Sequence, residues 1–329
     1  QTGVEQAYGP SFRRVMMRSR AKVSATFCGA LLALVMQSSM AVTILVSGLL
    51  GSSVLSFELG LAAILGADLG SALVIQFLSL DIHWLAPLML VVGGLMLLKS
   101  ETPVFRQIGR VIMGVALILI ALSLIRTSVS PLSKSSYLTD LASILERDFL
   151  TAFLMGALLA FLLHSSVAAV LMFVALVASE ALPLMVGVSL VLGANLGSSL
   201  LPIWMTRTMS PKARQLPLMN LFIRGGAALS MVVIVNRTPL FAHLSEINVG
   251  QQIILTHIIF NAMLLLAIPF SGLIGRCATR LLPEHHAPNE NMPAHYRSVL
   301  DKNTLGTPAL ALVCVQREIH RMLLLTGYD

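Results

Sequence analysis

The sequence contains the same stretch twice. Residues 29–73 align with 156–200 without a gap and with 19 identities in 45 positions. Two polar motifs stay in register: Gln-Ser-Ser (37–39) with His-Ser-Ser (164–166), and Gly-Ala-Asp-Leu-Gly-Ser (66–71) with Gly-Ala-Asn-Leu-Gly-Ser (193–198). A shared apolar bias would align leucines but not both polar motifs. The chain is therefore predicted to consist of two related halves.

The composition places these halves in a lipid bilayer. The chain is 56% hydrophobic and 11% charged, whereas a soluble domain carries about 25% charged residues. A helix needs about 20 apolar residues to cross the hydrocarbon core, and the sequence shows none of the alternation expected of a barrel. We therefore predict an all-α membrane protein, with long apolar runs at 59–80, 84–98, 108–125, 183–206, 216–236 and 250–275.

The number of crossings between the two copies sets their relative orientation. Three clear crossings separate one Ser-Ser pair from the next, and the segment around Ser38 and Ser39 is either a re-entrant hairpin or two full spans. Either choice gives an odd total, so the second copy is inverted. Inverted repeats with a site near mid-membrane are typical of secondary transporters.

The basic residues divide unequally between the two sides of this topology. The richer side should be cytoplasmic, which accounts for the net charge of +7 without nucleic acid. The C-terminus is therefore expected on the cytoplasmic side. The richer side holds Arg13, Arg14, Arg18, Arg20, Lys22, Lys99, Arg106, Arg207, Lys212, Arg214, Arg276 and Arg280; the other holds Arg126, Lys134, Arg147 and Arg237.

Both Ser-Ser motifs lie midway through apolar stretches, 24–55 and 150–179. Irregular backbone at that depth survives only where protein or a water-filled cavity surrounds it. A helix N-terminus at such a break offers free N–H groups and partial positive charge, which suit an anion. The alternative is that the serines only hydrogen-bond their own backbone or a neighbouring helix. The in-register duplication favours a substrate site, formed by two facing breaks with Gln37, Ser38, Ser39, His164, Ser165 and Ser166.

Polar residues in other apolar runs are further candidates. Asp68 is a mid-membrane carboxylate that marks an ion path or a structural ion pair, and its repeat equivalent is Asn195. Arg224 follows Asn220 by four residues, so both project from one helix face. Arg224 is an anion clamp, the partner of Asp68, or a side chain that snorkels to the membrane edge. His257 and Asn261 repeat the four-residue spacing, and Gly66, Gly70, Gly193 and Gly197 favour close helix packing.

The two ends of the chain differ from the middle. Residues 1–22 are a basic segment without the apolar core of a signal peptide, so we expect a cytoplasmic and truncated N-terminus. The segment 283–307 reads as a polar linker, and 308–325 carries a helical apolar stripe. We divide the chain into 1–22, a first transmembrane repeat at 23–136, an inverted second repeat at 137–282, and 283–329.

These motifs resemble the sodium/phosphate cotransporter family, in its bacterial form related to the type II animal carriers. The Gln37 and His164 motifs, the Gly-Ala-(Asp/Asn)-Leu-Gly-Ser pair, His257–Asn261 and the weaker Asn220–Arg224 carry the resemblance. It covers about 24–280, and 300–329 resembles the start of a PhoU-like domain. The resemblance implies inverted repeats with re-entrant hairpins, phosphate held at the two Ser-Ser turns, and sodium bound nearby. It also implies a location in the bacterial inner membrane.

The chain departs from the family pattern at several hydroxyls. Met40 and Val167 stand where the family has a third serine, and Val42 and Val170 replace threonines. The first span that is usual before the hairpin is expected to be missing. Asp68 replaces the usual asparagine, while Ser71 and Ser198 replace threonines. Fewer hydroxyls and one added carboxylate leave sodium and a proton open as the coupling ion.

We therefore predict a secondary transporter of inorganic phosphate, or a similar oxyanion, coupled to sodium. Arg224 is assigned to the substrate with the six hairpin residues, and the coupling ion to Thr43, Asp68, Ser71, Asn195 and Ser198. Asn220, His257 and Asn261 are expected to surround the site. No organic cofactor is expected, and monomer and homodimer are both left open.

Two alternatives come from other classes. A signalling or scaffold protein could act through its cytoplasmic helical domain and retain a decayed transport site. A hydrolase built on Ser165 and His164 is disfavoured, because neighbouring residues on a turn seldom align as nucleophile and base. Cys28, Cys277 and Cys314 lie far apart, without metal-ligand spacing or an expected disulfide.

Overall fold

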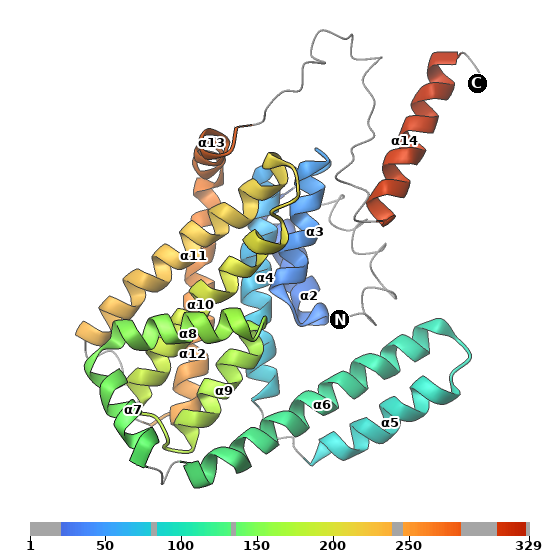
Figure 1. The fold of residues 1–329 in the computed structure, drawn as a ribbon. Helices are drawn as coiled ribbons and strands as arrows, with labels where there is room; N and C mark the ends of the chain where they lie inside the picture. The colour runs from blue at the N-terminus through green and yellow to red at the C-terminus, as the bar shows by residue number, and fades with distance from the viewer. Residues whose placement is uncertain (1–20, 80–83, 133–135, 239–245, 284–307, 327–329) are drawn as a thin grey trace.

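The computed structural model describes residues 21–79, 84–132, 136–238, 246–283 and 308–326, and all regular elements among them are helical (Figure 1). Five of the helical segments are long and apolar enough to cross a membrane. The expectations on residues 1–20, Lys134 and most of the linker lie outside the described ranges. The helices are α2 (Lys22–Met36), α3 (Ser39–Gly51), α4 (Phe57–Leu78), α5 (Leu85–Lys99), α6 (Pro103–Leu132), α7 (Ser136–Arg147), α8 (Phe149–Leu162), α9 (Ser166–Ala178), α10 (Leu184–Met205), α11 (Pro211–Arg237), α12 (Val249–Leu264), the 3₁₀ turn η2 (Leu265–Phe270), α13 (Ser271–Leu281) and α14 (Pro308–Thr326).

The helix boundaries repeat with the sequence. α3 and α9 begin and end at equivalent positions of the two aligned stretches, and the same offset relates α4 to α10. Polar residues set the helix starts: the Ser56 hydroxyl accepts from the Leu59 N–H at the start of α4, and the Asp148 carboxylate accepts from the Leu150 N–H at α8. Such side chains satisfy the N–H groups that a helix start leaves unpaired. The two halves predicted from the sequence are present.

Close glycine packing shows that each Ser-Ser segment is a re-entrant hairpin. A Cβ at Gly66 would collide with the carbonyl oxygen of Thr26, and one at Gly70 with that of Ala30. A step of four residues toward the C-terminus of α4 therefore matches a step of four residues toward the C-terminus of α2. The two helices are parallel. In this register α4 starts at the same end of the bundle as α2, slightly before it, so α3 must run back toward that end.

The second half repeats this packing. Gly193 meets the Phe153 carbonyl and Gly197 meets that of Ala157, which places α8 on α10 as α2 lies on α4. The structure thus selects the hairpin over two full spans. It also confirms the packing role of these glycines.

Contacts at the two ends of the bundle fix which loops share a side. At one end, Gln215 Nε2 donates to the Leu282 carbonyl at 3.0 Å, and Phe57 lies against Gly275. At the other end, Gln251 Nε2 donates to Gln76 Oε1 at 2.7 Å. The first hairpin starts from the former end and the second from the latter, so the inverted arrangement is confirmed.

The halves interlock through the second helix of each hairpin. α3 packs on α10 of the other half, and α9 packs on α4. The helices that follow break the symmetry: α11 packs on α10 and α3, whereas α5 pairs with α6 and projects from the bundle (Figure 1). Helix α7, whose buried Ala142 and Leu145 face α8 and α10, was not predicted from the sequence.

Candidate functional site

Both hairpins turn with the same backbone geometry. Gln37 and His164 each adopt the left-handed conformation with φ 53°. The next residues, Ser38 and Ser165, are extended with φ −157° and −152°, and each hydroxyl accepts a hydrogen bond of 3.2 Å from the N–H three residues later. New helices begin at Ser39 and Ser166. The predicted breaks are confirmed at the predicted residues.

This geometry suits an anion at both turns. A helix start leaves its first N–H groups without intrahelical partners, and the serine cap satisfies one of them. The remaining N–H groups carry the positive end of the helix dipole. The left-handed residue costs about 1–2 kcal/mol when it is not glycine. Both halves retain this cost at equivalent positions, as expected of a functional turn.

The two turns differ in exposure. Ser38 and Ser39 are buried, and the Thr43 hydroxyl donates to the Ser39 carbonyl at 2.9 Å. Ser165 and Ser166 are half-buried and the His164 side chain is exposed. The hydrogen bonds that Ser38 and Ser165 make stay within their own hairpins. Whether the two turns share one ligand therefore stays a prediction.

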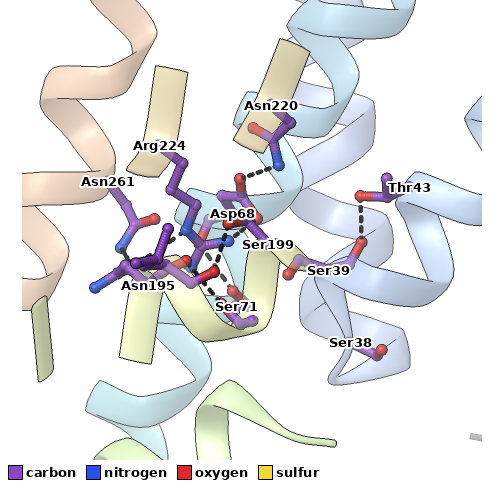
Figure 2. Close-up of polar contacts among 12 residues, drawn as sticks. Ser38, Ser39, Thr43, Asp68, Ser71, Asn195, Ser199, Asn220, Arg224 and Asn261 are labelled. Atoms are coloured by element: carbon purple, nitrogen blue, oxygen red, sulfur yellow. Dashed lines mark hydrogen bonds and ion pairs between the residues drawn. The ribbon is translucent and has the colours of Figure 1, made fainter. Parts of the chain in front are cut away.

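A buried polar cluster lies at the centre of the bundle, beside the first turn (Figure 2). Arg224 Nη1 donates to Asp68 Oδ1 at 2.6 Å, and both side chains are at most 2% exposed. Arg224 Nε and Nη2 donate to Asn195 Oδ1 at 3.2 and 2.8 Å. One guanidinium thus joins the equivalent side chains of the two halves.

The burial of Arg224 rules out one of the three interpretations made from the sequence. Arg224 is 1% exposed and lies near the middle of α11. The snorkelling alternative is therefore wrong, because the helix starts at Pro211, earlier than the apolar run suggested. Arg224 is the partner of Asp68.

Three more residues expected around the site complete the cluster. Asn220 Nδ2 donates to Asp68 Oδ2 at 3.2 Å. Asn195 Nδ2 lies 3.2 Å from His257 Nδ1, and Asn261 Nδ2 donates to the His257 carbonyl at 2.7 Å. The sequence spacing of four residues thus places both pairs on faces that meet Asp68 and Asn195.

The hydroxyl groups of Ser71 and Ser198 lie one helical turn after Asp68 and Asn195, respectively. Ser71 donates to the Asp68 carbonyl at 2.9 Å and Ser198 to the Asn195 carbonyl at 3.2 Å. Each hydroxyl oxygen keeps lone pairs that can accept from a donor or bind a cation. Thr43, the fifth residue assigned to the ion, lies in the first hairpin rather than in this cluster.

The unsatisfied atoms of the cluster are acceptors. Asn220 Oδ1 and Asn261 Oδ1 are buried and lack a donor among the described residues. The Arg224 guanidinium is already engaged by Asp68 and Asn195. A phosphate needs donors, so the hairpin turns suit it better than this cluster does.

Two polar features were not predicted from the sequence. Ser199 is buried beside the cluster, and its hydroxyl donates to the Leu196 carbonyl at 2.6 Å. Gln76 and Gln251 pair across the halves at one end of the bundle. A glutamine within an otherwise apolar run was the available signal. Among the described residues, no group of three His, Cys, Asp or Glu side chains could hold a metal ion.

The fold and the site define a membrane protein with two inverted halves, each with a broken-helix hairpin, the architecture of many secondary transporters. The model of the Na⁺/Pi-cotransporter family matches the chain twice in succession, over residues 1–127 and 128–267. The chain belongs to this family.

The chain is also similar to several curated proteins, some of which carry names that refer to phosphate. "Putative inorganic phosphate export protein YjbB" of Salmonella typhimurium is 32% identical over 327 residues, which is 98% of this chain and 59% of the relative. Its Escherichia coli K12 counterpart is 32% identical over 325 residues, again 59% of that protein. "Uncharacterized protein YqeW" of Bacillus subtilis is 24% identical over 282 residues, 85% of this chain and 91% of the relative. The chain thus spans about three fifths of the two YjbB proteins, and no solved structure matches it.

Proposed function

We propose that this chain is a secondary active transporter of inorganic phosphate, coupled to sodium and working by alternating access. The repeated hairpin turn carries the proposal, because equivalent breaks enter from opposite ends of the bundle with the same capped geometry. The family and the relatives' names support phosphate as the substrate.

The substrate is proposed to lie between the two turns. Gln37, Ser38 and Ser39 of the first hairpin and His164, Ser165 and Ser166 of the second would supply amide, hydroxyl and ring donors. The packing of α3 on α10 and of α9 on α4 supports a shared site, because each turn starts the helix that crosses to the other half. The Arg224 guanidinium lies near the first turn, where it is paired with Asp68 (Figure 2).

Sodium coupling is proposed from the family rather than from a complete ligand set. Thr43, Ser71 and Ser198 offer hydroxyl oxygens beside the turns and the central cluster. Alternating access would let the two halves rock about the fixed phosphate. The direction of net flux would follow the gradients.

The domain and membrane assignments are part of the same proposal. Repeats at 23–136 and 137–282 would span the inner membrane, with 1–22 and the PhoU-like segment 283–329 in the cytoplasm. The side holding Lys99, Arg106, Arg207 and Lys212 is the basic side, which favours the cytoplasm. A homodimer is compatible with this arrangement.

Uptake of radioactive phosphate into proteoliposomes tests the proposal. We expect uptake driven by an inward sodium gradient, and its loss in the double variant Ser38→Ala/Ser165→Ala. Ser56→Ala is the matched control, since Ser56 also caps a helix but lies away from both turns. Uptake that is absent in the wild type, or unchanged in the double variant, would refute the transport function or the site respectively.

A further inference from the structure

The central cluster is built on equivalent positions of the two halves. Asp68 and Asn195 align with each other in the repeat, and each is the twelfth residue of a 22-residue helix. Both side chains are buried, with 1% and 0% exposure. Their oxygens therefore converge at mid-depth, where an inverted-repeat carrier holds its ions.

The Arg224 guanidinium fills the position at which these oxygens converge. It binds Asp68 Oδ1 at 2.6 Å and approaches Asn195 Oδ1 with two nitrogens at 3.2 and 2.8 Å. Asp68 Oδ2 is engaged as well, by Asn220 Nδ2 at 3.2 Å. Both carboxylate oxygens of Asp68 and the side-chain oxygen Oδ1 of Asn195 thus already accept from nitrogen donors.

This arrangement does not fit a sodium ion at Asp68 and Asn195. A hard cation needs several oxygens directed at one point, and the fixed guanidinium would repel a second cation in this buried environment. The acceptors that stay unsatisfied, Asn220 Oδ1 and Asn261 Oδ1, belong to amides on either side of the guanidinium (Figure 2). They do not complete a cation site between the halves.

The charge balance of the cluster also argues against a sodium ion at Asp68 and Asn195. Asp68 and Arg224 form a buried ion pair with no net charge, and the side chains that contact them, Asn195 and Asn220, are amides. A buried carboxylate attracts a cation because its charge needs compensation. Here the protein's own side chain provides that compensation.

We propose that Arg224 is a built-in counter-cation, which occupies the place that a coupling sodium ion would otherwise take between Asp68 and Asn195. The inference rests on the proposed function, because a coupling ion has a role only in a carrier. It reassigns these two residues from sodium to Arg224, so that the position between Asp68 and Asn195 binds no coupling ion. Any sodium requirement would then arise at other oxygens, such as those near Thr43.

The melting temperature of the purified chain, measured by the fluorescence of Trp84 and Trp204, tests this assignment. Sodium, potassium and choline chloride are compared at equal ionic strength and without phosphate. We expect Arg224→Gln to gain a sodium-specific rise of a few degrees, because the freed Asp68 carboxylate then binds the ion. Adding Asp68→Asn to that variant should remove the gain.

The wild type and the double variant Asp68→Asn/Arg224→Gln decide the question even if the single variant does not fold. The double variant has no buried charge and keeps amides at both positions, so we expect the same sodium response as in the wild type. A sodium-specific rise in the wild type that the double variant loses would overturn the inference. So would a folded Arg224→Gln variant without any sodium response. Because phosphate is absent, a failed uptake experiment would refute the proposed function and leave this result standing.

Discussion

At the scale of single residues, the left-handed conformation at the hairpin turns has a measurable cost. His164 has φ 53° and an exposed side chain, so glycine should fit there better. We expect His164→Gly to raise the free energy of unfolding by about 0.5–1 kcal/mol, because part of the strain is offset by the greater freedom of glycine in the unfolded chain. Denaturant unfolding in detergent micelles measures the change.

Leu158→Gly is the matched control for that variant. Leu158 is also exposed but lies inside α8, where glycine should lower the free energy of unfolding by about 1 kcal/mol. If His164→Gly costs as much as the control, the histidine ring makes contacts worth more than the backbone strain.

The Asp68–Arg224 pair predicts strong coupling between two residues that are distant in sequence. Asp68→Asn leaves the Arg224 charge buried and unpaired, and breaking such a pair typically costs about 3–5 kcal/mol. Adding Arg224→Gln should recover more than half of that loss, since no buried charge is left. A double-mutant cycle measured by denaturant unfolding checks this. Additive losses would show that the two side chains act independently.

At the scale of helices, close approach at the glycines predicts where a single methyl group is not tolerated. A Cβ at Gly193 would meet the Phe153 carbonyl, whereas one at Gly226 meets nothing within 4 Å. We expect Gly193→Ala to lower the free energy of unfolding by at least about 1–3 kcal/mol through overpacking. Gly226→Ala, also within a helix, should raise it by about 0.5–1 kcal/mol. Similar effects at both positions would argue against the parallel contact of α8 with α10.

The sequence predicted the breaks in the two Ser-Ser segments well because their signals are local and occur twice. The motifs left open whether each segment is a hairpin or two full spans. The Ser-Ser caps, the glycine contacts and the spans of α4 and α10 all follow from motifs that stay in register between the two copies. The partner of Arg224 could not be decided from the sequence, since the depth of the residue depends on where α11 begins. Helix α7 was missed because 136–147 is short and carries charged residues among its leucines.

At the scale of the whole molecule, the inverted topology predicts opposite labelling of equivalent loops. Ser53 and Glu180 follow the two hairpins at equivalent positions, with φ 57° and 58°, and both are exposed. In a variant without Cys28, Cys277 and Cys314, we expect Ser53→Cys and Glu180→Cys to react with an impermeant thiol reagent from opposite sides of the membrane. Labelling from one side would contradict the inverted arrangement.

The departure from symmetry was not predictable from the repeat. α5 and α6 pair with each other away from the long helices, while α11 lies between α10 and α3. The repeated motifs end before α5, so the second part of each half carries no matching sequence to specify matching packing. The aligned region therefore determines the hairpins and the long helices, and tertiary contacts determine the rest.

Calorimetric titration of phosphate into the purified chain tests whether the two hairpin turns bind one anion together. If the two hairpin turns bind one anion between them, we expect one phosphate per chain. Ser38→Ala and Ser165→Ala should each weaken binding by about tenfold or more, since each removes a hydrogen bond to a charged group. Ser56→Ala should leave the affinity unchanged. Two phosphates per chain, each lost with one serine, or an affinity indifferent to both serines, would contradict a site shared by the two inverted halves.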